Sequence, residues 1–182
     1  NTIISNSFEP GSTFKPFTIA AALEEDVISY QQEYDCDGGE HLPGKYIKCN
    51  HVHHNIDLTE VLMYSCNDAL MQIGAKVGRS TFFDYQTSFL FGAKTNIDLP
   101  GEEIGIIKKK EEISPIDLAA ISFGQTDQVT MIQLAAAFSS LINGGNYYEP
   151  HVMKQVETEK GAVVQRNDGV IVKHTISKET SD

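Results

Sequence analysis

A serine and a lysine lie three residues apart at the start of an apolar segment, at Ser12 and Lys15. On a helix the two side chains share a face, so the lysine amine can reach the serine hydroxyl. A serine becomes a good nucleophile when a base takes its proton, and a lysine can be that base when its pKa is lowered. Burial beside Phe14 and Phe17 and the positive end of the helix dipole would both lower it. The spacing therefore fits covalent acyl transfer, although a capping serine beside a solvated lysine has the same pattern.

A second polar pair, Ser65 and Asn67, lies at a break between two helical patterns. Side chains two residues apart at such a break can both point into a cleft, although an ordinary turn has the same sequence. Cys66, between them, is expected to face away as a small buried residue.

The helix that carries Ser12 and Lys15 should begin close to them. Pro10 and Gly11 break the preceding chain, and Pro16 is tolerated only in the first turn of a helix, whose N–H groups have no intrahelical partner. The N-cap is therefore expected near Gly11 or Ser12. A residue before proline is biased away from helical dihedral angles, so the pattern and the local propensity conflict at Lys15.

Further helices are predicted by capping signals and apolar periodicity. Asp57 with Glu60, and Thr130 with Gln133, have the capping-box spacing, while Ser114 precedes a first-turn proline. The predicted helices cover residues 57–64, 68–77, 80–91, 116–121 and 130–143.

The remaining segments lack helical periodicity. Residues 31–56 are polar and rich in glycine, cysteine and histidine, and predict a long loop or a short hairpin. Residues 148–173 show short alternating runs with turns at Lys160-Gly161 and Asp168-Gly169, which predict short strands. The chain is expected to be helical first and strand-like last.

Composition restricts the class of protein. The 182 residues include 14 Lys and Arg against 25 Asp and Glu, a net charge of −11, and 41% are hydrophobic. This fits one folded domain or one lobe of a larger one, and it disfavours nucleic-acid binding. No apolar run reaches the roughly 18 residues that cross a bilayer. Since residue 1 is not methionine, a segment of a longer protein is expected, with any anchor outside it.

Cysteine and histidine cluster in the segment before the second predicted helix. Cys36 and Cys49 bracket a glycine-rich stretch in which a disulfide would close a loop easily. A zinc site has suitable ligands here but lacks the tight Cys-x2-Cys pair of common structural sites, so a disulfide or a solvated loop is preferred and no metal is expected. The six residues are Cys36, His41, Cys49, His51, His53 and His54.

Five separated segments resemble, in the same order, the penicillin-binding proteins, which are peptidoglycan D,D-transpeptidases. Residues 9–17 resemble the active-site stretch of that family, and residues 65–67 resemble its second motif, Ser-x-Asn. The resemblance continues through residues 91–102, 122–125 and 129–138. Because several matches in one order are far more specific than one motif, the chain is identified as a member of this family, most similar to its high-molecular-weight class B type.

The resemblance implies roles for the polar residues. Ser12 would be the acylated nucleophile and Lys15 the base that activates it. Ser65 would pass a proton between Lys15 and the departing amine. Asn67 would donate its amide to the substrate carbonyl and help to hold Lys15.

The resemblance also implies a fold and further contacts. The fold is α+β, here the mostly helical lobe of the penicillin-recognising serine transpeptidase (β-lactamase-like) fold, with a few short C-terminal strands. Gly124 and Gln125 are expected to bind substrate together with Asn67.

The third motif of the family, Lys-Thr/Ser-Gly on a strand that lines the cleft, does not occur in the sequence. Lys94-Thr95-Asn96 is rejected, because it lies too close after Ser65 and its asparagine would place a side chain where substrate backbone must lie. Residues 1–182 are therefore expected to be a partial transpeptidase domain, inactive or weakly active by itself.

By resemblance, the parent protein would cross-link cell-wall stem peptides. Its partners would be a D-Ala-D-Ala peptide and an acceptor amine, with β-lactams as covalent inhibitors and no cofactor. It would be anchored by an N-terminal segment at the extracytoplasmic face of the bacterial cell membrane, in a cell-wall synthesis complex. The alternatives are a serine β-lactamase or β-lactam sensor domain, distinguished by turnover of the antibiotic, and a non-catalytic module.

Overall fold

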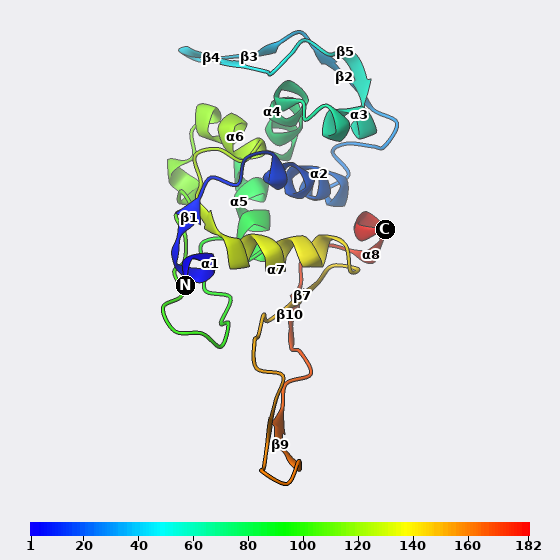
Figure 1. Ribbon diagram of the computed structural model, residues 1–182. Helices are drawn as coiled ribbons and strands as arrows, with labels where there is room; N and C mark the ends of the chain where they lie inside the picture. The colour runs from blue at the N-terminus through cyan, green and yellow to red at the C-terminus, as the bar shows by residue number, and fades with distance from the viewer.

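One helix, α2, lies at the centre of the fold. The computed structural model describes residues 1–182, and in it α2 packs between α4 and α7, while α6 packs against α4 (Figure 1). No helix has the length and apolar composition that crossing a membrane requires. The helices are α1 Thr2–Ser5, α2 Lys15–Glu24, α3 Leu58–Met63, α4 Asn67–Val77, α5 Arg79–Ser88, α6 Pro115–Ser122, α7 Met131–Leu141 and α8 Lys178–Ser181, with the 3₁₀ turns η1 Gly11–Phe14 and η2 Lys110–Glu112.

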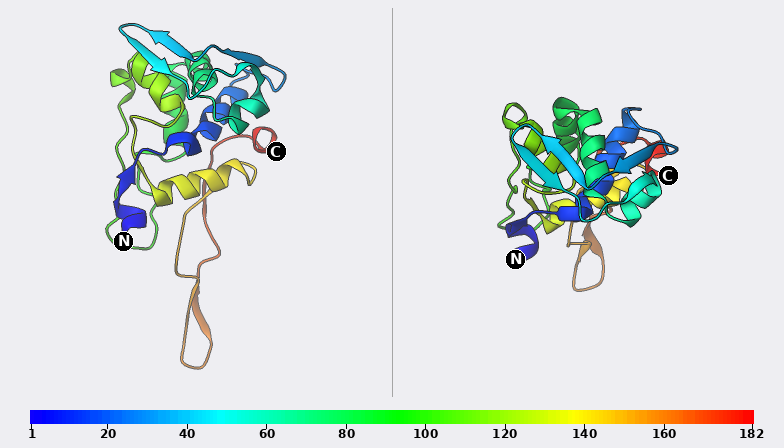
Figure 2. Two further views of the ribbon diagram at one scale, coloured as in Figure 1. Left: turned by 45° about the horizontal axis from the view of Figure 1, so that its top comes forward. Right: turned by 90° about the horizontal axis from the view of Figure 1, so that it is seen from above.

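The strands form five separate antiparallel pairs: β1 with β6, β2 with β5, β3 with β4, β7 with β10, and β8 with β9. The β8–β9 hairpin turns near Lys160-Gly161, as predicted, and extends away from the helices in both views of Figure 2. The strands are β1 Ser7–Phe8, β2 Glu33–Cys36, β3 Gly39–Leu42, β4 Lys45–Lys48, β5 His54–Asp57, β6 Val129–Thr130, β7 Asn146–Tyr148, β8 Gln155–Glu157, β9 Val163–Arg166 and β10 Ile171–His174.

Residues 31–56 contain more regular structure than the sequence predicted. Four strands, β2 to β5, lie in or at the end of this segment, and Figure 1 shows them over one end of the helices. In β2 the side chains alternate, with Tyr34 and Cys36 buried and Glu33 and Asp35 exposed. A four-residue alternation is too short to distinguish from the surrounding polar sequence, so the sequence alone predicts a loop or a short hairpin here.

The start of α2 differs from the prediction. A 3₁₀ turn, η1, holds residues 11–14, and α2 begins at Lys15 with Phe14 as its N-cap. Pro16 has no N–H to donate to the Ser12 carbonyl, and the N–H of Lys15 donates to that carbonyl instead. The tighter i→i+3 bond therefore replaces the first α-helical turn, and the predicted N-cap near Gly11 or Ser12 is wrong. Pro16 does lie in the first turn, as predicted.

An aromatic cluster holds this segment in place. The ring of Phe17 lies 4.9 Å from that of Phe89 and 5.2 Å from that of Phe91, and the Phe14 ring lies 5.3 Å from Phe91. All four side chains are buried. The hydroxyl of Thr18 donates to the Ser122 carbonyl at 2.8 Å and joins α2 to α6. Residues on both sides of Lys15 are thus fixed by packing that lies outside the polar site.

The predicted caps are confirmed. Capping boxes close the N-termini of α3, α6 and α7, at Asp57, Ser114 and Thr130. The cap at Asp57 fixes where α3 begins, while the N-cap of α4 is Cys66, at the Ser65–Asn67 junction.

The Lys94-Thr95-Asn96 segment is not part of a strand. It lies in the loop after α5, where the buried Glu102 carboxylate accepts hydrogen bonds from the Thr95 backbone N–H at 2.7 Å and its hydroxyl at 2.6 Å. A hydroxyl committed to a buried carboxylate is not available to a ligand. This agrees with its rejection as the third motif.

Candidate active site

The structure brings together the four residues that the sequence singled out. Ser12 comes from η1 and Lys15 from the first turn of α2, while Ser65 and Asn67 come from the junction between α3 and α4. The Ser12 and Ser65 hydroxyl oxygens are 2.8 Å apart. Lys15 Nζ lies 2.7 Å from Ser65 Oγ, 2.5 Å from the Ser65 carbonyl oxygen and 2.7 Å from Asn67 Oδ1. The chain thus places a nucleophile, a hydroxyl and an amine in one connected network.

No direct hydrogen bond joins Ser12 to Lys15, although the sequence predicted that the amine would reach the hydroxyl across a helical face. Ser12 lies in a 3₁₀ turn and Lys15 in the following α-helix, so the two side chains do not have the i, i+3 spacing of one regular α-helix. The Lys15 amine instead contacts Ser65, and Ser65 contacts Ser12. The connection therefore runs through a relay of one hydroxyl.

The backbone around Ser65 is unusual. Ser65 has φ +54°, in the left-handed region that non-glycine residues seldom adopt. Its N–H donates to the Leu62 carbonyl at 3.1 Å, and the N–H of Cys66 donates to the Val61 carbonyl at 3.0 Å. This is the Schellman pattern that ends a helix, with serine where glycine is usual. It turns both the carbonyl and the hydroxyl of Ser65 toward Lys15, and a strained residue of this kind is typical of a functional site.

The environment of Lys15 makes its amine easier to deprotonate than that of an exposed lysine. Burial lowers the pKa of Lys15 from 10.5 to about 8, against the opposing effect of the Cys49 and Cys66 sulfurs. A neutral amine has two N–H donors and one lone pair. The two donors fit the Ser65 carbonyl and Asn67 Oδ1, which leaves the lone pair for the Ser65 hydroxyl proton. The protonated amine has three donors for the same three oxygens, so the site accommodates both states.

The residues predicted to bind substrate differ in their surroundings. The side-chain amide of Asn67 donates to Asn50 Oδ1 at 3.2 Å, while its oxygen accepts from Lys15. Gln125 is exposed, whereas Gly124 is buried against Gly11. The backbone N–H of Gly11 donates to the Gly124 carbonyl at 2.8 Å. The structure therefore gives Gly124 a supporting contact behind the nucleophile. Substrate contacts of Asn67, Gly124 and Gln125 stay predictions.

Two supporting residues were missed by the sequence reasoning. Thr126 has φ +82°, and its N–H donates to the Glu9 carboxylate at 2.9 Å. Together with the Gly11–Gly124 contact, this bond fastens the segment before Ser12 to the loop after α6. No local signal marks Glu9, because its partner lies 117 residues away in sequence.

Replacing Gly124 by alanine is expected to displace η1 and Ser12. A Cβ atom at Gly124 would lie 2.0 Å from the Gly11 carbonyl oxygen, and the φ of Gly124 is +88°. Backbone strain and overpacking together predict a loss of roughly 2–5 kcal/mol in the free energy of unfolding. Denaturant unfolding of both proteins measures it.

The matched control is Gly101→Ala. Gly101 has φ +84°, but a Cβ atom there meets nothing within 4 Å. This variant therefore reports the strain without the clash, and it should lose about 1–2 kcal/mol. Equal losses in the two variants would show that the Gly11–Gly124 contact does not constrain the nucleophile.

The cysteine and histidine residues divide into two groups. Cys36, Cys49 and His53 lie together, and Cys66 joins them, whereas the sequence had assigned Cys66 only a buried position. Cys66 is indeed fully buried. All three cysteines are free thiols in the structure, so the disulfide considered between Cys36 and Cys49 is not formed there. His41, His51 and His54 are exposed and lie outside this cluster.

Comparisons with known proteins identify the family to which the chain belongs. The family model described as the penicillin binding protein transpeptidase domain matches residues 1–182. The chain is 36% identical over 185 residues to Stage V sporulation protein D of Bacillus subtilis, covering all of this chain and 29% of that protein. It is 31% identical over 147 residues to peptidoglycan D,D-transpeptidase FtsI of Escherichia coli, covering 81% of this chain and 25% of that protein.

Solved structures show the same fold. Penicillin-binding protein 3 of Mycobacterium tuberculosis, complexed with aztreonam, superposes with a TM-score of 0.88 at 24% identity, over all of this chain and 41% of that one. The transpeptidase domain of Burkholderia pseudomallei penicillin-binding protein 3 gives a TM-score of 0.87 at 21% identity, over all of this chain and 52% of that one. The predicted α+β fold class is thereby confirmed. With its family model matched from end to end, the chain belongs to the penicillin-binding protein transpeptidase family.

Proposed function

We propose that this chain supplies the nucleophile, base and relay of a serine peptidoglycan D,D-transpeptidase. The observation that carries the proposal is the continuous contact from Ser12 through Ser65 to Lys15. Burial lowers the pKa of Lys15 to about 8. The relatives named as peptidoglycan D,D-transpeptidases support the reaction class. The substrate would be a stem peptide that ends in D-Ala-D-Ala.

In the first half-reaction, Ser12 Oγ attacks the carbonyl carbon of the penultimate D-Ala. Its proton passes to the Ser65 hydroxyl while the proton of Ser65 passes to Lys15 Nζ. Collapse of the tetrahedral intermediate breaks the peptide bond, and the departing D-Ala amine takes a proton back through Ser65. An acceptor amine then attacks the acyl-Ser12 ester and loses its proton through Ser65 to Lys15. Collapse of this second tetrahedral intermediate breaks the ester bond, and the released Ser12 oxygen takes the proton back along the same route, so Lys15 ends neutral again.

Electrostatic stabilisation of the oxyanion would come in part from the first turn of η1. The initial N–H groups of a helical turn lack intrahelical partners and can donate to a developing negative charge. A Lys-Thr/Ser-Gly strand would supply the second donor and bind the substrate carboxylate, and this sequence does not contain that tripeptide. Losing one such donor costs roughly 3 kcal/mol in the barrier. We therefore propose that the chain is part of a domain completed elsewhere in a parent protein.

The same proposal implies partners and a location. β-Lactams would acylate Ser12 in the same way, because they present a strained amide to the same nucleophile. The stem peptide and the acceptor amine would lie on the extracytoplasmic side of the bacterial membrane, where the parent protein would be anchored in a cell-wall synthesis complex. Acyl transfer by serine, hydroxyl and amine needs no cofactor.

Labelling with a fluorescent penicillin tests the proposal. The parent protein should form one long-lived adduct per chain, and mass spectrometry of its peptides should place the adduct on Ser12. The isolated 182-residue chain should label slowly or not at all. Adduct formation at another residue of the parent protein would refute the assignment, and rapid release of hydrolysed penicillin would indicate a β-lactamase instead. Stoichiometric labelling of the isolated chain would refute its expected incompetence.

A further inference from the structure

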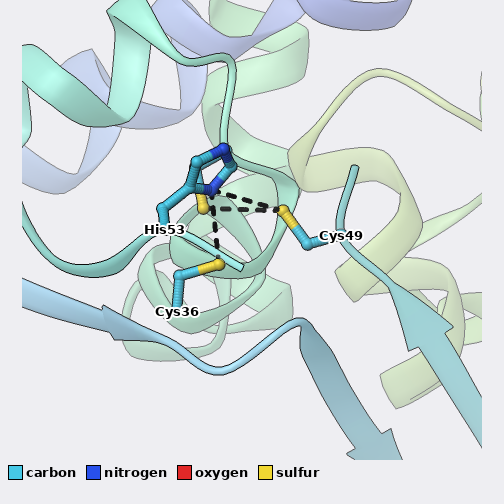
Figure 3. Close-up of side chains that lie close together, drawn as sticks. Cys36, Cys49 and His53 are labelled. Atoms are coloured by element: carbon cyan, nitrogen blue, oxygen red, sulfur yellow. Dashed lines mark hydrogen bonds between the residues drawn. The ribbon is translucent and has the colours of Figure 1, made fainter. Parts of the chain in front are cut away.

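Four metal-ligating side chains meet directly behind the Ser65–Asn67 junction. Cys36 comes from the end of β2, Cys49 from the segment after β4, His53 from the residue before β5, and Cys66 from the N-cap of α4. Their ligand atoms all lie within 4.8 Å of one another. Figure 3 shows the Cys36 and Cys49 sulfurs and the His53 ring converging on one point. The cluster therefore joins the β2–β5 pair and the segment after β4 to the N-terminus of α4.

The separations fit four bonds to one central ion. Cys49 Sγ lies 3.6 Å from Cys66 Sγ, and His53 Nδ1 lies 3.4 Å from Cys36 Sγ and 3.9 Å from Cys49 Sγ. With Zn–S bonds of about 2.3 Å and Zn–N bonds of about 2.0 Å, tetrahedral geometry places neighbouring ligand atoms roughly 3.5–3.8 Å apart. A disulfide would instead require two sulfurs about 2.05 Å apart and would leave the third thiol and the imidazole without a role.

Backbone N–H groups and an aromatic ring contact the ligand side chains of the cluster. The backbone N–H of Asn67 donates to Cys49 Sγ at 3.2 Å, and that of Ala69 donates to Cys66 Sγ at 3.4 Å, both from the first turn of α4. The His53 ring stacks on Tyr64 at 5.6 Å and 8°, which holds its Nδ1 edge toward the sulfurs. Such outer contacts orient the ligands of metal sites and tune their basicity.

We propose that Cys36, Cys49, His53 and Cys66 form a tetrahedral Zn²⁺ site. Three sulfurs and one imidazole nitrogen are a donor set that selects zinc over the oxygen-seeking cations Mg²⁺ and Ca²⁺. On binding, three Zn–S bonds and one Zn–N bond form, and the thiols release their protons to solvent. The ion keeps its oxidation state, so no oxidant or reductant is involved. All four positions are filled by protein, which is the arrangement of a structural site.

A zinc ion at this site would fasten strands β2 to β5 to the Ser65–Asn67 junction. Cys66 lies between Ser65 and Asn67, and the Cys49 sulfur accepts the Asn67 N–H. A metal bound here would hold β2 and the approach to β5 against the N-terminus of α4. The inference does not depend on the proposed reaction, because metal content and thermal stability are measured without substrate.

The test is metal analysis of the parent protein, expressed without a histidine tag and purified in a phosphine reductant, which contains no competing thiol. Inductively coupled plasma mass spectrometry should find close to one zinc per chain. After removal of zinc with a chelator, Tm should fall, and Zn²⁺ should restore it. Replacement by Co²⁺ should produce the thiolate charge-transfer bands and the strong d–d absorption of a tetrahedral sulfur-rich site.

Variants locate the ion. His53→Ala and Cys36→Ser should weaken zinc binding more than about 100-fold, because replacing even an outer-shell partner typically costs 10–100-fold. His51→Ala removes an exposed imidazole two residues away and should retain the metal. If a variant fails to fold, the Co²⁺ spectrum of the unaltered protein still shows whether the metal has tetrahedral, sulfur-rich coordination.

Three results would overturn the proposal: three titratable thiols with no bound metal, a disulfide between two of the cysteines in the purified protein, or zinc that binds equally well in His53→Ala.

Discussion

Replacing Lys15 by methionine is expected to slow the acylation of Ser12 by a β-lactam by roughly 10²- to 10⁴-fold, the contribution that a well-placed general base makes. Methionine keeps the unbranched apolar stem of a side chain that is 1% exposed, so the packing beneath η1 should survive. What disappears is the atom that accepts the proton from Ser65 Oγ at 2.7 Å. The second-order rate constant for labelling of the parent protein measures the effect.

The pH dependence of labelling gives this variant its sharpest control. The base is the neutral amine, and burial lowers the pKa of Lys15 to about 8, so about a tenth of the molecules carry the active base at pH 7. Labelling should therefore quicken about tenfold between pH 6 and pH 7, and level off above pH 8. Lys15→Met should lack this rise. If the unaltered protein labels at the same rate at pH 6 and pH 9, Lys15 is not the base.

The parts of this site that sequence reasoning found are those with a local cause. The capping pairs at Asp57 and Thr130 fix helix starts through bonds to residues three positions away, and each is confirmed. Pro16 similarly restricts the first turn of α2 through its own missing N–H. In each case the physical cause lies within one helical turn of the residue, so spacing alone reveals it.

Reasoning from local spacing could not show the contacts between distant segments. Ser12 and Lys15 are three residues apart, but Ser65, which connects them, lies 53 residues from Ser12. The spacing suggested a direct contact because nothing in a local pattern shows that a third side chain separates the two. The clamp from Glu9 to Thr126 is hidden for the same reason.

The cluster of Cys36, Cys49, His53 and Cys66 shows what spacing along the sequence leaves out. Cys36 and Cys49 suggested a disulfide because they bracket a flexible stretch, and zinc was disfavoured because no Cys-x2-Cys pair is present. The structure also places Cys66 in this cluster, a residue of the Ser-x-Asn motif that the sequence predicts only to be small and buried. Four ligands from four elements can meet without any tight pair, since the fold and not the sequence spacing sets their separation.

Replacing Ser65 by alanine is expected to slow acylation by roughly 10²- to 10³-fold, because the proton of Ser12 then has no route to the amine. Alanine accepts the same left-handed backbone about as poorly as serine, so the strain at φ +54° is unchanged and the folded structure should persist. The Lys15 amine would retain its contacts with the residue 65 carbonyl and with Asn67 Oδ1. The variant thus removes the relay while leaving both of its ends in place.

Combining the two substitutions distinguishes a relay from two independent aids to catalysis. If Ser65 acts by passing the Ser12 proton to Lys15, its hydroxyl is of little use once the amine is absent, so the double variant should label almost as fast as Lys15→Met alone. If the residues act separately, the two losses should multiply to roughly 10⁴-fold or more. A multiplied loss in proteins with unchanged unfolding free energies would contradict the Ser12–Ser65–Lys15 pathway, because residues that form one proton path cannot lose their effects independently.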